Sequence, residues 1–403
     1  MFNGVVRLLR TTIALAAALA MLAAPAVHAQ SSEGGVEPHT ELPPGDTGFD
    51  RAGMWIWYTS RSHGGDPARI AARARRSGIG TVYVKSGDAA DTWSQFNRPF
   101  VAALKRRGLR VCAWQFVYGQ HPVGEARVGA ASVRRGADCL VIDAESHYEG
   151  RYAQADRYVR ALRARIGAVF PLSLASFPYT DYHPAFPYSV FLGPGGAQYN
   201  QPQMYWKAIG TSVREVYEHS YLWNRLYDRP IYPIGQTYAA PGTAALRLFR
   251  RFADSYGGLP PSWWSWQETD AGEWAALGSL TDGPLPGYRP VSSHPVLRRG
   301  ARGDQVVWAQ QHLRAAGSPG IPVTGVYGTL TYRAVRRFQA ARGLRVDGVL
   351  GTGTWRALLG VRPVRVHWSA PRADTARAAT LARAPLSATL PARGNEIPAP
   401  SRR

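Results

Sequence analysis

The sequence predicts an α/β protein in which a (β/α)8 TIM-like barrel is followed by a small three-helix module. From residue 53 onward, short apolar and aromatic runs alternate with helix-like segments, the pattern of parallel strands connected by helices. There are about eight such runs, the number that closes a barrel of roughly 250 residues. No Gly-x-Gly-x-x-Gly sequence follows the first run, so a doubly wound open sheet is the less favoured alternative.

The expected strands are short runs rich in apolar, aromatic and β-branched residues. They span 54–58, 81–85, 110–117, 139–144, 172–177, 202–206, 231–237 and 263–266. Between them, Asp66-Pro67 has the form of an N-cap followed by proline at the first helical position. Gly78, Gly108 and Gly136 each follow an arginine-rich final turn. Three helices in succession that end in this way fit the outer ring of a barrel.

A repeated phrase marks the C-terminal module. It reads Val323-Thr-Gly-Val-Tyr-Gly-Thr in the first copy and Val346-Asp-Gly-Val-Leu-Gly-Thr in the second. Each copy has the form of a glycine-rich turn that opens a helix. We expect the helix between the copies to span 331–342 and to end at Gly343. A further helix is expected after Asp304.

Three segments of this module occur at a consistent spacing: Leu297-Arg-Arg-Gly-Ala-Arg-Gly-Asp-Gln-Val, Ala334-Val-Arg-Arg-Phe-Gln and Gly343-Leu-Arg-Val-Asp-Gly-Val-Leu-Gly-Thr-Gly-Thr-Trp. Together they resemble the type-1 peptidoglycan-binding domain. The resemblance implies that the chain binds peptidoglycan glycan strands. It does not identify the contacting side chains, because the same Gly, Phe and Trp residues also build a helical bundle.

The first 29 residues have the organisation of a secretory signal peptide, with Arg7 and Arg10 ahead of an apolar run and small residues at Val27-His-Ala29. No later segment reaches the ~20 apolar residues of a transmembrane helix. The expected mature protein is therefore secreted, and extracellular or cell-wall associated. The expected divisions are a signal peptide (1–29), a flexible leader (30–48), the barrel (49–280), a mobile linker (281–293), the peptidoglycan-binding domain (294–360) and a disordered basic Ala/Pro/Arg tail (361–403).

The chain is strongly basic, with a formal net charge of +21 that comes mainly from arginine. A basic exported protein is attracted to polyanions, so anionic wall polymers are candidate further partners. Nucleic acid is not expected as a partner, because the sequence-level modules that bind it are missing.

No metal or cofactor site is expected from the sequence. The histidines show neither His-Glu-x-x-His nor another ligand pair, which disfavours a zinc peptidase or amidase. Cys112 and Cys139 fall near the starts of neighbouring expected strands, which disfavours a cysteine peptidase. The two cysteines can form a disulfide or remain two buried thiols.

The fourth expected strand ends in two carboxylates, Asp143 and Glu145. Residues two apart on a strand point to the same face, here into the barrel mouth where this fold carries its chemistry. Two carboxyl groups held close together raise the pKa of one of them and leave a proton to donate, as glycosidic cleavage requires. The alternative is that Asp143 caps a helix or pairs with an arginine.

Asp138-Cys-Leu-Val-Ile-Asp-Ala-Glu145 is similar to the catalytic strand of family-18 chitinase-like glycosidases, with Val141 in place of the second aspartate. Asp143-Ala-Glu145 and Trp266-Gln267 resemble family-25 lysozymes, whose first-strand aspartate is missing here. The chitinase-like resemblance implies that Glu145 is the general acid and base and that Asp143 orients the substrate's N-acetyl group. A glycoside hydrolase of the muramidase or N-acetylglucosaminidase kind is the expected activity. The missing aspartates keep a non-catalytic glycan-binding barrel as the alternative.

Five further residues are candidate substrate contacts. Tyr205, on the sixth expected strand, can hydrogen-bond the N-acetyl group or a sugar hydroxyl. Trp206 and Trp266, close to the expected barrel mouth, can stack on the apolar faces of sugar rings. Gln115 and Gln236, near the ends of the third and seventh expected strands, can bond sugar hydroxyls. Core packing is the alternative for the aromatic residues.

Overall fold

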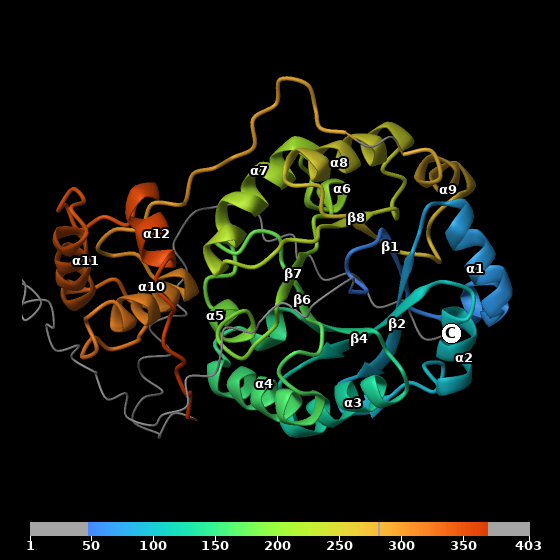
Figure 1. Ribbon diagram of the computed structural model, residues 1–403, viewed down its shortest axis with the longest axis horizontal. Coiled ribbons are helices and arrows are strands. Elements are labelled where there is room, and N and C mark those ends of the chain that lie inside the picture. Colours follow the sequence, from blue (N-terminus) through green and yellow to red (C-terminus); the bar gives the residue numbers. More distant parts are fainter. Residues whose placement is uncertain (1–46, 281–282, 370–403) are drawn as a thin grey trace, which may run out of the picture. The chain divides into compact units, whose positions relative to one another are not determined.

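The computed structural model describes residues 47–280 and 283–369 (Figure 1). These residues all belong to one compact unit. The expected signal peptide, nearly all of the expected leader and most of the expected tail lie outside the described residues. The described chain forms a barrel of parallel strands and a group of three further helices.

Within the described residues, eight parallel strands form a barrel, as the sequence predicts. They are β1 (Gly53–Ile56), β2 (Thr81–Asp88), β4 (Arg110–Val117), β5 (Cys139–Ala144), β6 (Leu172–Ser176), β7 (Tyr199–Pro202), β8 (Ile234–Gln236) and β9 (Ser262–Trp264). Their hydrogen-bonded order is β7-β6-β5-β4-β2-β1-β9-β8. Isolated bridges pair Asn200 with Ile231 and Gln203 with Ile234, which brings the two ends of the sheet together. A short additional strand, β3 (Asp91–Thr92), pairs antiparallel with the end of β2.

Helices surround the barrel (Figure 1). They are α1 (Pro67–Arg76), α2 (Arg98–Lys105), α3 (Pro122–Arg134), α4 (Tyr152–Ile166), α5 (Tyr188–Phe191), α6 (Trp206–Ile209), α7 (Val213–Asn224), α8 (Thr243–Ser255) and α9 (Ala271–Leu277). The predicted N-cap is confirmed, because the Asp66 side chain accepts a hydrogen bond of 2.8 Å from the backbone N–H of Ala68. Gly78, Gly108 and Gly136 have φ values of 66°, 85° and 103°, the left-handed backbone that glycine tolerates at helix ends.

The sixth strand lies three residues earlier than the sequence predicts. The apolar run Met204-Tyr-Trp favoured a strand at 202–206, but β7 is the polar segment Tyr199–Pro202, and Trp206 begins α6. The side-chain NH₂ groups of β7 have buried hydrogen-bond partners: the Asn200 amide donates to Asn224 at 2.8 Å, and the Gln201 amide to the Tyr83 hydroxyl at 3.4 Å. Because these amides are paired inside the protein, a polar strand can be buried.

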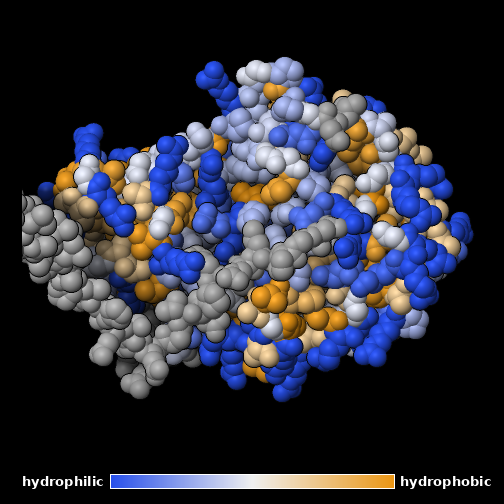
Figure 2. All heavy atoms as spheres, viewed as in Figure 1, coloured by the Kyte–Doolittle hydropathy of each residue, from blue (hydrophilic) through white to orange (hydrophobic). Residues whose placement is uncertain are grey.

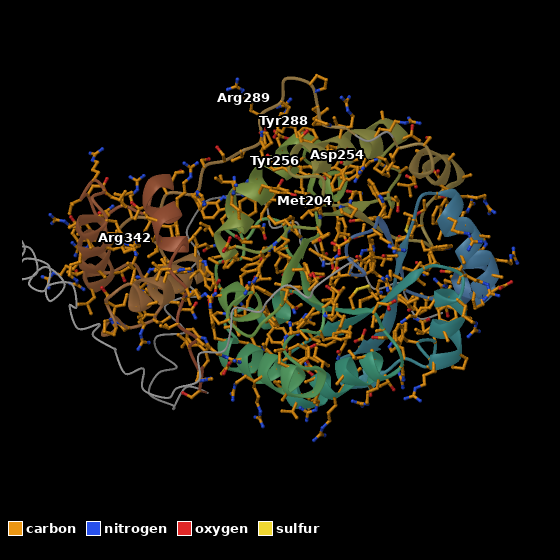
Figure 3. All side chains as sticks on the ribbon, in the orientation of Figure 1. Met204, Asp254, Tyr256, Tyr288, Arg289 and Arg342 are labelled. Atoms are coloured by element: carbon orange, nitrogen blue, oxygen red, sulfur yellow. A yellow bond between two sulfur atoms is a disulfide. The ribbon has the colours of Figure 1, made fainter. Side chains whose placement is uncertain are left out.

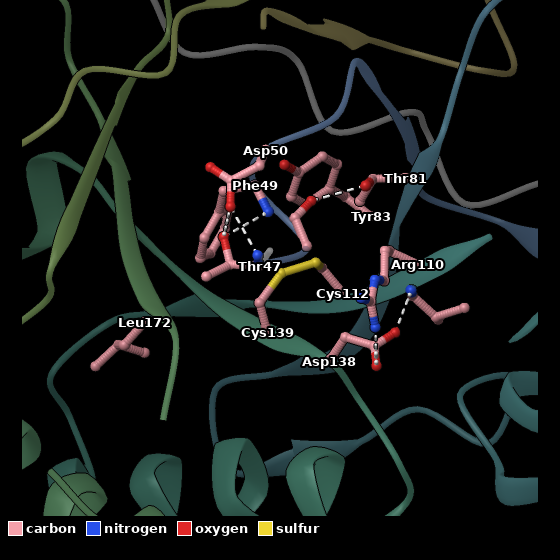
Figure 4. Close-up of a disulfide and its surroundings, with 12 residues drawn as sticks. Thr47, Phe49, Asp50, Thr81, Tyr83, Arg110, Cys112, Asp138, Cys139 and Leu172 are labelled. Carbon is pink, nitrogen blue, oxygen red and sulfur yellow. Dashed lines mark hydrogen bonds and ion pairs between the residues drawn. A yellow bond between two sulfur atoms is a disulfide. The ribbon is translucent and has the colours of Figure 1, made fainter. Parts of the chain in front are cut away.

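A disulfide between Cys112 and Cys139 crosses neighbouring strands at the N-terminal end of the barrel (Figure 4). Both cysteines are buried among aromatic residues that include Phe49 and Tyr83. Residues 47–50 lie over the disulfide, and a Cβ at Gly48 would stand only 2.5 Å from the Cys112 sulfur. This close approach requires glycine. Of the two states left open by the sequence, the structure contains the disulfide.

The described part of the expected linker packs against the barrel instead of forming a loose connection. The Tyr288 hydroxyl lies 2.9 Å from that of Tyr256, and the backbone N–H of Gly283 donates to Asp254 at 2.8 Å (Figure 3). The first residues of the expected tail, 361–369, also make contacts, since the Trp368 ring packs on Tyr152 with 4.5 Å between ring centroids. These segments are polar and rich in proline, but their aromatic side chains pack on the barrel and so fix their position.

The module contains three helices, α10 (Asp304–Ala315), α11 (Thr329–Ala341) and α12 (Thr352–Leu359). A buried glutamine organises each copy of the repeated phrase. The Gln310 side chain accepts from the backbone of Gly325 at 3.0 Å and donates to Thr331 at 2.9 Å. Gln339 makes the equivalent bonds to Gly348 at 2.8 Å and Thr354 at 3.1 Å. The repeat in the sequence is therefore a repeat in hydrogen bonding.

Asp304, the first residue of α10, is buried among barrel residues. Its carboxylate accepts bonds from the backbone and hydroxyl of Ser189 (2.8 and 2.6 Å) and from the hydroxyls of Tyr152 (2.9 Å) and Tyr227 (2.8 Å). Burial nevertheless raises the pKa of Asp304 to about 6. Loss of water outweighs the four hydrogen bonds, so ionisation of Asp304 weakens this contact as the pH rises toward 6.

The surface shown in Figure 2 is largely hydrophilic, with hydrophobic residues interspersed and strongly hydrophilic ones spread around its edge. Among the described helices, none is both long and apolar enough to cross a membrane.

Candidate active site

Asp143 and Glu145 lie at the C-terminal end of β5. Asp143 is the last residue but one of the strand and is only 6% exposed, whereas Glu145 directly follows the strand and is half-buried. Alternation along β5 explains their common direction, because Val141 and Cys139, two and four residues earlier, belong to the cluster that fills the barrel interior. The two carboxylates therefore lie at the barrel mouth, as the strand periodicity predicts.

One amide ties the two carboxylates together. The Gln203 side-chain NH₂ donates to Asp143 Oδ1 at 3.1 Å and to Glu145 Oε1 at 3.0 Å. Gln203 directly follows β7, two residues beyond the inward-facing Gln201. Each hydrogen of the amide group thus serves a different carboxylate, which fixes the geometry of the pair without neutralising it.

Asp143 holds its proton more tightly than an ordinary aspartate. Burial raises the pKa of Asp143 well above its usual range, and the neighbouring Glu145 raises it further. Lys85 and the Gln203 hydrogen bond lower the pKa of Asp143, and Asp88 adds to the rise. The pair therefore holds a proton to higher pH than two ordinary carboxyl groups would, the direction that a general acid requires.

A buried lysine lies beside the pair. The Lys85 ammonium, on β2, is 2.6 Å from Asp88 and lies over three tryptophan rings. Its distances to the ring centroids are 4.7 Å for Trp57, 4.5 Å for Trp93 and 4.9 Å for Trp114. Cation–π attraction and the ion pair together offset the cost of removing this charge from water.

Tyr118 forms another side of the mouth, just beyond β4. Burial raises the pKa of Tyr118 to about 12, and a hydrogen bond with Asp88 contributes. Its ring packs edge-on against His147, with 4.7 Å between centroids. The loop that carries Tyr118 is fixed by the buried Glu125 carboxylate, which accepts the backbone N–H groups of residues 118–121 at 3.0–3.2 Å. Tyr118 is therefore held by its backbone and remains a neutral hydroxyl near neutral pH.

Half-buried aromatic rings follow one edge of the mouth. Trp57 stacks on Tyr58 with an interplanar angle of 9°, and Tyr58 packs on Trp93 with 5.4 Å between centroids. We call Trp57, Tyr58 and Trp93 the aromatic strip. Partly exposed, rigid rings of this kind match the apolar faces of sugars.

Among the predicted substrate contacts, only Tyr205 borders the carboxylates. It follows β7 instead of lying on it, and its pKa is raised chiefly by burial, with Asp143 and Glu145 contributing. Its ring packs edge-on against Tyr238 at 5.4 Å. The hydroxyl is therefore near the pair and stays protonated.

The structure does not bring Trp206 and Trp266 to the mouth. Trp206 is 4% exposed and stacks on Phe249 of α8, and Trp266 is 5% exposed and packs on Trp274 of α9. Both rings lie between the barrel and its helices. Being close in sequence to a strand end does not determine the side of the barrel on which a ring packs.

Gln115 and Gln236 also make structural contacts away from the mouth. The Gln115 amide donates to the carbonyls of Ala89 and Glu125 at 2.7 and 2.9 Å, because this residue alternates with Trp114 and points outward. The Gln236 oxygen accepts the backbone N–H groups of Lys207 and Ala208 at the start of α6. Both side chains bond to backbone groups, and both residues are fully buried.

Gln203, Lys85 and Trp93 are site residues that the sequence reasoning missed. For Gln203, the available signal was the alternation Tyr199, Gln201, Gln203, which was obscured because the strand was expected too late in the chain. Lys85 ended an expected strand and could have been read as an inward-facing position. Trp93 lies in a loop, where the sequence carries no period to indicate its direction.

In the described part of the chain, no group of three or more His, Cys, Asp or Glu side chains could hold a metal ion. With two carboxylates, an amide, a buried ammonium and tyrosine hydroxyls, this arrangement can carry out acid–base chemistry on a polar substrate.

Comparison with known proteins identifies the C-terminal region. Residues 302–358 match the family model described as a putative peptidoglycan binding domain. The resemblance predicted from the repeated glycine phrases is thus confirmed for this part of the chain. No curated protein sequence matches the chain.

Several solved structures are similar to parts of the chain. The N-terminal domain of SleB is 41% identical over 16% of this chain and 90% of that chain, with a TM-score of 0.16. A family 39 glycoside hydrolase from Bacteroides cellulosilyticus WH2 is 11% identical over 65% of this chain and 69% of that chain, with a TM-score of 0.40. The C-terminal domain of a putative chitinase from Desulfitobacterium hafniense DCB-2 is 8% identical over 58% and 98%, with a TM-score of 0.43. The barrel assignment itself rests on the strand order described above.

Proposed function

We propose that the chain is an exported, cell-wall-associated glycoside hydrolase that binds peptidoglycan through its C-terminal domain and hydrolyses the N-acetylhexosamine glycan strand with its barrel. The observation that carries the proposal is the pair Asp143 and Glu145, bridged by Gln203 at the barrel mouth. Export is supported by the buried Cys112–Cys139 disulfide, which forms in oxidising compartments.

Cleavage would begin with the proton that the pair retains. When this proton is on Glu145, the more exposed member, it can be donated to the leaving glycosidic oxygen. The Asp143 carboxylate can then accept the N–H of the substrate's N-acetyl group, whose carbonyl oxygen attacks the anomeric carbon. Water later opens this intermediate while Glu145 takes back a proton. The bond broken is the glycosidic C–O bond, and one new reducing end forms.

Substrate would be held by the groups around the pair. The aromatic strip offers stacking faces, and the hydroxyls of Tyr118 and Tyr205 remain protonated donors. Lys85 supplies positive charge next to Asp143 while its ammonium group stays packed over the tryptophan rings.

A non-catalytic glycan-binding barrel is the second candidate, and Val141 favours it. This side chain is buried in the barrel interior, where the chitinase-like strand would carry another aspartate. Without that aspartate, the Asp143–Glu145 pair has one acid fewer to share its proton. A barrel can keep its fold and its sugar contacts after losing turnover.

The release of reducing ends from purified peptidoglycan tests the proposal. We expect release by the wild type and a loss of roughly 100- to 10,000-fold for Glu145→Gln, because the proton donor is removed. Glu149→Gln is the matched control: Glu149 is four residues further along and pairs with His183 at 2.7 Å. Pelleting with peptidoglycan, measured for every variant, reports on folding and wall binding.

The outcomes separate the candidates. Release that is lost in Glu145→Gln and kept in Glu149→Gln supports the hydrolase. Pelleting without release by the wild type supports the binding protein. Undiminished release by Glu145→Gln would remove this residue from the mechanism.

A further inference from the structure

A cavity of about 700 Å³ lies beside the candidate active site, between the β4–α3 loop and α4. These elements are neighbours at the edge of the barrel (Figure 1). The lining includes Arg151, Arg157 and Arg160, together with Gln120 and Gln154. We call this cavity the arginine pocket. None of its lining residues is acidic.

The arginines reach the pocket because of their spacing along the chain. Arg151 precedes the first residue of α4, and Gln154, Arg157 and Arg160 follow at intervals of three residues. Residues three apart lie on one side of a helix, so this side of α4 presents a row of guanidinium and amide groups. Like charges at this spacing repel each other, which an anion bound between them would relieve.

The guanidinium groups retain donors that the protein does not use. Arg160 engages Asp156 through Nε at 3.0 Å, which leaves its two terminal nitrogens. Arg151 donates through one terminal nitrogen to the Tyr118 carbonyl at 3.3 Å. Arg157 is exposed and makes no side-chain hydrogen bond or ion pair with any residue that the structure describes. Of the acids near the pocket in sequence, the buried Asp156 pairs with Arg160 itself. Glu149 pairs with His183, and Glu125 holds the loop backbone.

The pocket continues from the candidate active site. Tyr118 contributes its ring to the barrel mouth and its carbonyl to Arg151, and the next two residues, Gly119 and Gln120, line the pocket. On its other side the pocket is walled by Trp368, whose ring packs on Tyr152. The volume exceeds that of a single ion, so a polymer segment with anionic groups fits it better than an isolated anion.

We propose that the arginine pocket binds phosphate groups of an anionic wall polymer and so holds that polymer next to the barrel mouth. Arginine suits this ligand because its planar fork bonds two phosphate oxygens at once. The pocket is separate from the peptidoglycan-binding domain and from the Asp143–Glu145 pair, so it can act whether or not the barrel hydrolyses glycan.

Charge reversal in the full chain tests the pocket. Arg157→Glu places an acid between the two remaining arginines, and Arg69→Glu on α1 makes the same change of net charge at an exposed arginine outside the pocket. Binding is measured to cell wall that carries phosphate polymers and to the same wall after their chemical removal. We expect Arg157→Glu to weaken binding to the phosphate-bearing wall roughly tenfold, and Arg69→Glu to leave it within about twofold. Thermal unfolding of both variants verifies their folding.

Each result decides the proposal. A loss confined to Arg157→Glu and to the phosphate-bearing wall supports it. Equal losses in both variants would mean that overall positive charge, and not this pocket, attracts the polymer. If Arg157→Glu weakens binding equally to the stripped wall, the ligand is a carboxylate of the peptide stems and the phosphate assignment is wrong. Full binding by Arg157→Glu would exclude the pocket as a site.

Discussion

The disulfide inside the barrel provides a quantitative test of the structure. Replacing both Cys112 and Cys139 by alanine removes a cross-link between positions 27 residues apart in sequence. The chain-entropy relation for a loop of this length gives about 12 cal/mol/K, or about 3.5 kcal/mol of stability at 25 °C. For a barrel of this size, such a loss lowers the Tm by about 10 °C. Unfolding of the barrel can be followed by tryptophan fluorescence during urea and thermal titrations.

The wild type with and without reductant is the control for this measurement. Reduced wild type should resemble the alanine variant, because both lack the cross-link. Glycan release per folded molecule should not change, since the disulfide lies at the N-terminal end of the strands and Asp143 at the other. A double variant that unfolds within about 1 kcal/mol of the wild type would refute the entropic argument.

Three further predictions concern polar groups that are buried or half-buried. The pKa of Asp304 is raised to about 6 in the folded protein, so the folded state keeps a proton that the unfolded chain releases. The free energy of unfolding should therefore fall by about 3 kcal/mol as the pH rises from about 4 to 6. Asp304→Asn should remove this slope in urea titrations across that range. Lys85→Met removes the cation that lowers the pKa of Asp143, so the alkaline limb of the pH profile of glycan release should move to higher pH. Gln203→Ala should lower glycan release at least about tenfold while pelleting with peptidoglycan is unchanged, because the bonds to both carboxylates are lost but the binding domain is intact.

The barrel could be predicted because its strands and helices repeat simple signals. Period-two alternation placed Asp143 and Glu145 at the mouth, and glycine after arginine-rich turns marked the ends of the helices. These signals are local, and the surrounding fold does not override them. The repeated glycine phrases of the module are local in the same sense, since Gly325 and Gly348 share a φ of 70°.

The details of the site were harder to predict because they depend on partners that are distant in sequence. β7 is polar, and its burial depends on Asn224 and Tyr83, which accept hydrogen bonds from its side-chain NH₂ groups. Hydropathy therefore favoured the apolar run that follows it, and Gln203 was missed. Trp206 and Trp266 pack outward for a related reason, since α8 and α9 supply the aromatic partners that cover them.

The choice of an amide to join the two carboxylates has a consequence for the working range of the site. An arginine or lysine in the place of Gln203 would lower the pKa of both acids and favour their ionised forms. A third carboxyl group would itself titrate, so its hydrogen bonds to the pair would change with pH. The amide does not titrate, so its two hydrogen bonds can persist while a proton moves between Asp143 and Glu145. Gln203 thus keeps the distance between the two carboxyl groups constant. Only their charge changes while one of them donates a proton and later takes one back.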